Sequence, residues 1–159
     1  MTNRSELNAN NAKVIDEFRQ KGGKVASRPG QQLVLLNTIG AKSGLHRTNP
    51  VSYIQRDDCI YVFATKGGSP VHPDWYFNFV ANPVITIELP FGMYKVTAVT
   101  VNGPERDAIY AEQVKLRPHF ADYERRTTRI IPVVALCLGT ESGDTPPAHL
   151  TLYSEKHAP

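Results

Sequence analysis

Short runs of β-branched and aromatic residues, separated by turn-forming residues, occupy the chain from residue 33 onward and limit most strongly how it can fold. They predict strands over residues 33–39, 47–56, 59–65, 84–89, 93–102 and 131–138. The first two strands are joined through residues 41–44, the second pair through Asp57-Asp58, and the fourth and fifth through residues 90–92. Such short connections indicate antiparallel pairing. We therefore expect a mainly β protein with some α-helix, built as a closed or half-closed barrel of about six antiparallel strands rather than a doubly wound sheet.

Helices are predicted at the periphery of this barrel. Apolar residues at helical spacing indicate one over residues 5–21, and Gly22-Gly23 ends it. Three more are expected over residues 73–81, 105–116 and 119–126. The predicted organisation is an N-terminal helix and linker (1–30), a barrel domain (31–140) and a C-terminal tail (141–159), in which residues 149–153 could add an edge strand.

Composition excludes several classes of protein. With 159 residues, of which 41% are hydrophobic, the chain can form one domain with a genuine core. A net charge of +3 is too small for a nucleic-acid binder. No basic segment followed by an apolar one opens the sequence, and no apolar run approaches the roughly 20 residues of a membrane span, so we expect a protein that is neither exported nor membrane-spanning. Cys59 and Cys137 lack the paired spacings of a disulfide framework, which fits a reducing cytoplasm.

The charges are unevenly distributed. Between Phe18 and Arg56 there is no Asp or Glu, although seven Lys and Arg residues lie at positions 19, 21, 24, 28, 42, 47 and 56. Such a stretch concentrates positive potential and suits a phosphorylated or carboxylated small ligand. The basic residues after the helix at 5–21 also leave open a peripheral contact of this helix with the inner face of a membrane, beside ordinary packing of its short apolar face.

Several kinds of catalytic site are missing from the sequence. The five histidines are too scattered for a metal site, no serine lies in a nucleophile-elbow pattern, and the dinucleotide-binding fingerprint is absent. If the chain is an enzyme, its reactive chemistry must come mainly from a bound organic cofactor.

Two glycine-containing loops are candidates for binding an anion. We call residues 40–47 the first loop; here Lys42, Ser43 and Arg47 can donate to phosphate or carboxylate oxygens. Residues 64–70, the second loop, contain Lys66-Gly67-Gly68 directly after a predicted strand and before a helix. Each could instead be an ordinary connection, a polar hairpin and a strand-to-helix turn respectively. Because they flank adjacent strands, the two together favour a binding site.

Aromatic residues form two further groups. Trp75 and Phe79 share one helix face and are expected to cover the barrel core, whereas Tyr76 and Asn78 have polar ends that could orient a ring system. Phe120 and Tyr123 could form the wall of an apolar substrate pocket, or simply pack in the core.

Taken in order, four motifs resemble those of the deazaflavin (coenzyme F420)-dependent nitroreductase and quinone reductase family of actinobacteria. They are Gly40-x-Lys42-Ser43-Gly44-x-x-Arg47, Lys66-Gly67-Gly68, Pro73-x-Trp75-Tyr76-x-Asn78 and Ala81-Asn82-Pro83, and the match extends from residue 33 to about residue 136. The resemblance implies a split β-barrel related to flavin mononucleotide (FMN)-binding barrels, with reduced F420 as hydride donor. It also implies an F420-dependent reductase that acts on quinones, nitro compounds or activated enones.

The same resemblance implies roles for individual residues. Lys42, Ser43, Arg47 and Lys66 are expected to contact the phosphate and glutamate tail of F420, with the Gly67-Gly68 backbone beside it. The deazaflavin pocket would be lined or supported by Asn49, Thr65, Trp75, Tyr76 and Asn78. The chain departs from the family's nitroreductase pattern in the substrate pocket, where Ser52 and Phe120 stand in place of tyrosines while Tyr123 is retained.

These residues define the predicted chemistry and its alternatives. Hydride would pass from C5 of the reduced deazaflavin to a small-molecule electron acceptor, with Tyr123, Ser52 or solvent as the proton donor. An FMN-dependent oxidoreductase on the same barrel is the nearest alternative, although one phosphate needs fewer cations than the two loops offer. A non-catalytic F420 carrier and a peripheral membrane quinone reductase also remain open. The sequence does not define the oligomeric state.

Overall fold

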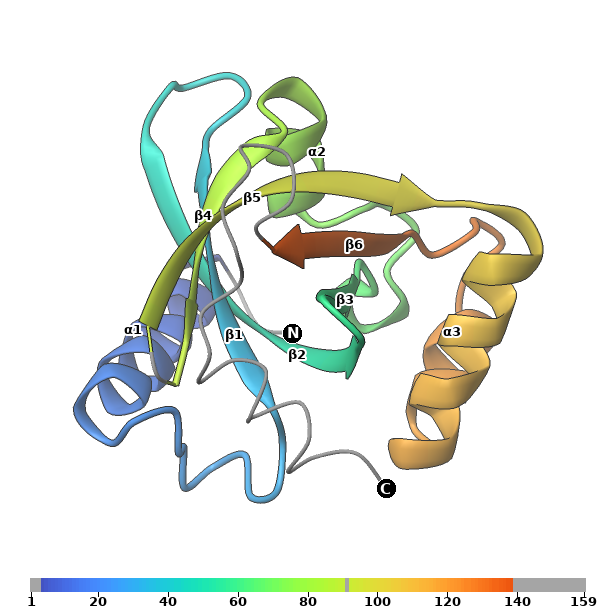
Figure 1. Cartoon of the computed structure of the whole chain (residues 1–159), viewed down its shortest axis with the longest axis horizontal. Coiled ribbons are helices and arrows are strands. Elements are labelled where there is room, and N and C mark those ends of the chain that lie inside the picture. The colour runs from blue at the N-terminus through green and yellow to red at the C-terminus, as the bar shows by residue number, and fades with distance from the viewer. Residues whose placement is uncertain (1–3, 91, 139–159) are drawn as a thin grey trace.

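One barrel of six strands dominates the part of the chain that the computed structural model describes, residues 4–90 and 92–138 (Figure 1). The strands are β1 (Leu33–Ile39), β2 (His46–Arg56), β3 (Cys59–Phe63), β4 (Val84–Leu89), β5 (Gly92–Val101) and β6 (Val133–Leu138). They follow one another around the barrel in the order β1-β2-β3-β6-β5-β4, and pairing of β4 with β1 closes it. Every neighbouring pair is antiparallel, as the sequence predicts.

The helices lie outside the barrel, with α1 and α3 on opposite sides of it in Figure 1. They are α1 (Arg4–Gln20), α2 (Asp74–Ala81), α3 (Gly103–Leu116) and α4 (Phe120–Arg125), with a single 3₁₀ turn, η1 (Lys66–Gly68), in the second loop. None of the helices within the described ranges is long and apolar enough to cross a membrane.

Buried apolar side chains pack both inside the barrel and between the outer face of β1 and helix α1. Side chains that alternate along β1 point to opposite faces, so Val34 and Leu36 enter the barrel interior while Leu33 and Leu35 face α1. All four are buried because β1 is covered on both sides. Helix α2 adds Trp75 and Phe79 to the interior cluster, which agrees with the expectation that these two rings cover the barrel core.

Helix α1 is fixed to the barrel by apolar packing and by one ion pair. Val14 and Phe18 are buried against β1, so the barrel occupies these two positions of the apolar face that a membrane contact would use. Arg19 donates to both carboxylate oxygens of Glu88 on β4, at 3.0 and 2.8 Å. Asn37 donates to the same carboxylate at 3.0 Å. These contacts lower the pKa of Glu88, with the Arg19 hydrogen bond as the largest cause.

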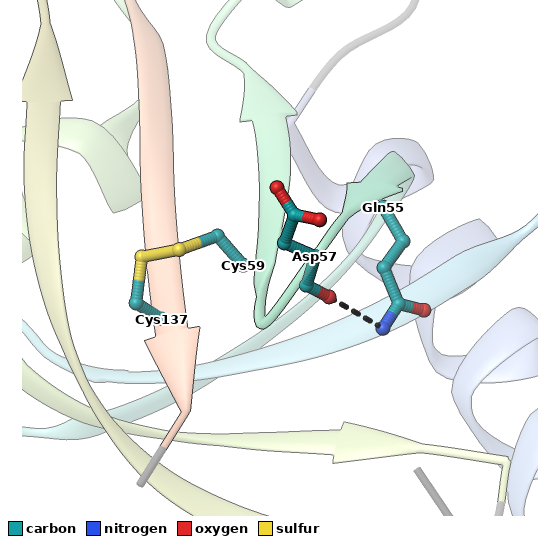
Figure 2. The surroundings of a disulfide bond; sticks show 4 residues. All are labelled: Gln55, Asp57, Cys59 and Cys137. Carbon is teal, nitrogen blue, oxygen red and sulfur yellow. Dashed lines mark hydrogen bonds between the residues drawn. A yellow bond between two sulfur atoms is a disulfide. The ribbon is translucent and has the colours of Figure 1, made fainter. Parts of the chain in front are cut away.

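The cysteines correct one expectation from the sequence, because Cys59 and Cys137 form a disulfide (Figure 2). Strand β6 is last in the chain but pairs with β3, and the register places the two cysteines directly opposite each other. The neighbouring Leu138 N–H donates to Asp58 O at 3.0 Å, so the cysteines occupy a non-hydrogen-bonded position, where opposite side chains are closest. Spacing along the sequence gives no sign of this proximity, since 78 positions separate the two residues.

Element boundaries differ from the predicted ones by a few residues. Strand β3 ends at Phe63 rather than 65, because the Thr65 N–H turns back to Phe63 O at 2.9 Å. Strand β6 begins at Val133, directly after Pro132, which has no N–H for the ladder. Helix α3 begins two residues earlier than predicted, at Gly103. The predicted tail over 141–159, with the candidate edge strand at 149–153, lies outside the described residues.

Candidate functional site

A cavity of about 1490 Å³ opens beside the two glycine-containing loops. Both loops, strand β2 and helices α1, α2 and α4 contribute to its wall. Of the residues singled out in the sequence, those lining it are Lys42, Ser43, Arg47, Asn49, Ser52, Thr65, Lys66, Gly67, Trp75, Asn78, Phe120 and Tyr123. The fold therefore brings most of the predicted site residues to one place.

The first loop is a tight turn between β1 and β2. Gly40 N–H donates to Leu45 O at 2.7 Å, and Gly44 N–H donates to Gly40 O at 2.9 Å. A side chain at Gly40 would collide with the Ser43 hydroxyl, and Gly44 has a φ of 70°, which is in the left-handed region. The two glycines are thus required for the shape of this loop. Lys42 and Arg47 stay exposed at its surface.

Asn78 of α2 connects this loop to the helix. Its Oδ1 accepts from Ala41 N–H at 2.9 Å, and its Nδ2 donates to the Thr38 hydroxyl at 3.1 Å. The side chain is buried, so the bond to Thr38 is shielded from water and the bond to Ala41 is partly shielded. Asn78 therefore sets the position of the first loop in addition to lining the cavity.

The second loop contains three successive residues in the left-handed region. Lys66, Gly67 and Gly68 have φ values of 45°, 62° and 83°. Lys66 is one of two non-glycine residues with positive φ in the described part of the chain, and such a conformation needs support from its surroundings. That support comes from Arg129 and Arg126, whose guanidinium groups donate to carbonyls of this loop.

The cavity is electropositive along the two loops. Lys42, Arg47 and Lys66 all line it, and none of them forms an ion pair with a carboxylate of the described residues. Arg28 lines it as well and likewise has no carboxylate partner there. Unpaired cations around one cavity attract an anion with several charges.

The part of the cavity assigned to the substrate is more apolar. Three aromatic rings line it, with Phe120 between Phe63 and Tyr123. The ring centroids are 5.8 Å apart for Phe63 and Phe120 and 5.1 Å apart for Phe120 and Tyr123. On the other side, the Ser52 hydroxyl donates to Gln31 Oε1 at 3.2 Å. The Ser52 proton is thereby engaged within the protein, whereas no partner for the Tyr123 hydroxyl occurs among the described residues.

Two of the predicted cofactor-binding residues do not line the cavity. Gly68 is buried behind the loop, where an added Cβ would come within 2.9 Å of Tyr123 O and of Arg126 Cβ. The Tyr76 hydroxyl lies 3.2 Å from the Thr100 hydroxyl, which directs it toward β5. Both residues are therefore placed to support the site rather than to touch a ligand in the cavity.

The structure adds residues that sequence reasoning did not single out for the site. Asn11, Ala12 and Ile15 of α1 line the cavity, as do Arg28 and Gln31 from the linker that follows. Of these residues, only Arg28 could be suspected from the sequence, because it is one of the basic residues in the stretch without Asp or Glu. Arg129, which holds the second loop from behind, gave no signal because nothing in its neighbourhood along the chain resembles a motif.

The chain is similar in sequence to proteins of one known family. A family model described as F420H(2)-dependent quinone reductase matches residues 11–137. An F420H(2)-dependent quinone reductase of Mycobacterium tuberculosis is 35% identical over 124 residues, which are 75% of this chain and 83% of that protein. Another protein of the same organism, described as a putative F420H(2)-dependent quinone reductase, is 30% identical over 103 residues, 65% of this chain and 87% of its own length.

Solved structures agree with these matches. An F420-H2 dependent reductase is 36% identical with a TM-score of 0.60, covering 66% of this chain and 93% of that one. The heme storage protein HutZ of Vibrio cholerae has a TM-score of 0.53 at 14% identity, covers 79% of this chain and 88% of its own, and supports the fold alone.

Proposed function

Because the chain belongs to the F420H(2)-dependent quinone reductase family, we propose that it carries a hydride from reduced F420 to a quinone bound in the cavity described above. Membership makes the protein an oxidoreductase with coenzyme F420 as its cofactor. The finer parts of the proposal are the class of acceptor and the role of each residue.

The residues around the cavity fit an anionic cofactor. Lys42, Arg47 and Lys66 are exposed cations without carboxylate partners in the described ranges, and the volume of about 1490 Å³ exceeds that of an ordinary small-ligand pocket. We assign the phosphate and glutamate tail to these three cations and to Ser43. Asn49, Thr65, Trp75 and Asn78 would then lie around the ring system, with Gly67, Gly68 and Tyr76 shaping the walls.

The acceptor would lie against the aromatic side of the cavity. Phe120 is buried there and Tyr123 is half-buried, so a flat apolar molecule could pack on this wall and exclude water. When bound, reduced F420 supplies the hydride, from C5 of its ring. Reduction of a quinone to a hydroquinone also requires a proton, and we assign its donation to the Tyr123 hydroxyl, for which no hydrogen-bond partner occurs among the described residues. Ser52 is the weaker candidate because its proton is engaged by Gln31.

The observation that carries the proposal is the convergence of both loops on one cavity that also has an aromatic wall. Its first test is a binding titration of the purified protein with F420 and, separately, with FMN. We expect F420 to bind at least tenfold more tightly, since one phosphate uses only part of the cationic surface. Preferential binding of FMN would contradict the proposal.

The second test separates an enzyme from a carrier. Oxidation of reduced F420 is followed with menadione, a nitroimidazole and an activated enone as acceptors. We expect turnover with menadione and slower turnover with the other two, because Ser52 and Phe120 replace tyrosines of the nitroreductase pattern. Tight binding of F420 without turnover of any quinone in a panel would favour the carrier.

A further inference from the structure

Arg129 gathers the carbonyl groups of the second loop on the side away from the cavity. Its guanidinium donates to Ser69 O at 2.9 Å, to Ala64 O at 3.2 Å and to Thr65 O at 2.8 Å. Arg126 adds a longer contact to Gly67 O at 3.4 Å, and the Lys66 carbonyl accepts from Ser69 N–H at 3.1 Å. Carbonyl oxygens repel anions. Because Arg129 and Arg126 bind these oxygens, the oxygens do not face an anionic ligand in the cavity.

The consequence for the amide groups follows from peptide geometry. In a trans peptide the C=O and the following N–H point in opposite directions, and the described chain has no cis peptide. Since the Thr65 carbonyl points to Arg129, the Lys66 N–H points away from it. Within the described residues neither Lys66 N–H nor Gly67 N–H has a hydrogen-bond partner, and both residues line the cavity. Both donors are therefore unused by the described part of the protein, and the Lys66 N–H points away from Arg129, which does not line the cavity.

The same guanidinium also connects the loop to α2. Arg129 Nη1 lies 2.9 Å from His72 Nδ1. Arginine cannot accept a hydrogen bond, so Nδ1 is the acceptor and His72 is neutral in this contact. The His72 ring packs on Tyr76 and Phe77, with ring centroids 4.9 and 5.6 Å apart. Arg129, which lies after α4, therefore connects to the second loop directly and to helix α2 through His72.

We propose that Arg129 is a positioning residue for the cofactor, holding the second loop so that an anion in the cavity meets amide donors and Lys66 rather than carbonyl oxygens. Arg129 itself does not line the cavity, so it acts through the loop. The identity of the anion as F420 rests on the proposed function, whereas the action of Arg129 on the loop does not.

The test compares Arg129→Met and Arg129→Lys with Arg125→Met. Arg125 is close by in the chain, but it is exposed and pairs only with Asp122, at 2.8 Å, among the described residues. We expect Arg129→Met to raise the Kd and the KM for F420 by about 10- to 100-fold, with little change in the KM for menadione. Arg129→Lys should recover part of the loss, because an ammonium group can still donate to some of the carbonyls. Arg125→Met should behave as wild type.

A second measurement reports on the loop without any ligand. Gly68 N–H and Ser69 N–H donate to Thr65 O and Lys66 O, and their hydrogen exchange should accelerate in Arg129→Met while that of β3 does not. Wild-type affinity for F420 in Arg129→Met would overturn the proposal, and so would equal losses for F420 and menadione. If Arg129→Met does not fold, Arg129→Lys decides by the same two criteria. Should wild type not bind F420, the proposed function fails, yet selective acceleration at the loop would still support the role of Arg129.

Discussion

The carboxamide oxygen of Asn78 accepts the backbone N–H of Ala41 at 2.9 Å, which joins α2 to the first loop across 37 positions of sequence. The Asn78 amide group donates in turn to Thr38, at the end of β1 that leads into the loop. One buried side chain thus fixes both the strand and the turn that carries Lys42.

Replacing Asn78 by Leu should therefore harm stability and cofactor binding together. The change leaves the Ala41 N–H and the Thr38 hydroxyl without their partner, at a cost of about 1–3 kcal/mol in the free energy of unfolding. We expect F420 affinity to fall by about tenfold because the loop loses its position. Chemical denaturation and F420 titration measure the two effects. Asn82→Ala, at the exposed end of the same helix, is the control and should change neither.

The cations of the first loop should contribute to affinity in a salt-dependent way. Lys42→Met and Arg47→Met each remove a charge that faces the cavity and should weaken F420 binding about tenfold at low salt. Lys95→Met removes the same charge from an exposed position on β5 outside the cavity. Titrations at several salt concentrations should show a shallower dependence for the two loop variants than for Lys95→Met. Equal slopes in all three would show that the loop does not bind the tail.

Tyr123 and Ser52 should differ in their effect on turnover. Loss of a general acid commonly costs a factor of about 100 or more, and water can replace part of it, so Tyr123→Phe should lower kcat with menadione by about 10- to 100-fold. Ser52→Ala should leave kcat close to wild type, because the Ser52 proton is directed to Gln31. Steady-state kinetics in H₂O and D₂O measure both. The reverse ranking would assign the proton to Ser52.

His72 should make stability depend on pH below neutrality. Burial, and secondarily the charge of Arg129, lower the pKa of His72 from its ordinary value of 6.5. As the pH falls below about 6.5 the unfolded chain takes up a proton that the folded protein resists, so the free energy of unfolding falls until the folded pKa is passed. Above about pH 7.5 the contribution is constant.

The matched variant for this prediction is His72→Gln, which keeps an acceptor for Arg129 and does not titrate. The difference in unfolding free energy between wild type and variant, measured from pH 8 to pH 5, should shift in favour of the variant at acid pH. A difference that stays constant over this range would mean that His72 is not held in its neutral form.

The disulfide should add to thermal stability. A cross-link between residues 78 positions apart restricts the unfolded chain and is worth about 4 kcal/mol in the chain-entropy model. Reductant, or the pair of changes Cys59→Ser and Cys137→Ser, should therefore lower Tm by roughly 10 °C, while F420 affinity at room temperature stays near wild type. Thiol labelling and intact mass before and after reduction check that the bond is present. A Tm that does not respond to reductant would contradict its contribution.

Local patterns predict the strands, the hairpins and the barrel class, but not the order of the strands around the barrel. The six strands, their hairpins and the helices were correct in kind because each depends on near neighbours in the sequence, such as Asp57-Asp58 at the turn between β2 and β3. The loops around Lys42 and Lys66 could be found because glycine and lysine in a turn have a chemical meaning by themselves. Boundaries were less accurate, since they depend on single hydrogen bonds such as that of Thr65.

What the sequence did not reveal depends on contacts between distant segments. The pairing of Cys59 with Cys137 requires knowing that the last strand returns beside the third. Arg129 donates to backbone carbonyl groups about 60 positions earlier in the chain. Every residue has such a carbonyl, so no residue type in the sequence marks the ones that Arg129 binds. Gln31 reaches Ser52 only because the linker after α1 folds over β2. Each of these contacts is decided by topology rather than by local composition.

The attachment of α1 to the barrel has a consequence for how such a protein can acquire new acceptors. Asn11, Ala12 and Ile15 form part of the cavity wall, yet they belong to a helix that neither carries the cofactor-binding loops nor contributes a strand. Ile15 also packs against the cluster of Val14 and Phe18 that attaches the helix, whereas Asn11 and Ala12 are not part of that cluster. Because the ion pair of Arg19 with Glu88 and this packing hold the helix, Asn11 and Ala12 can change without loosening it. Under the proposed function, changes at Asn11 and Ala12 would alter the space open to the acceptor and leave the two glycine-containing loops as they are.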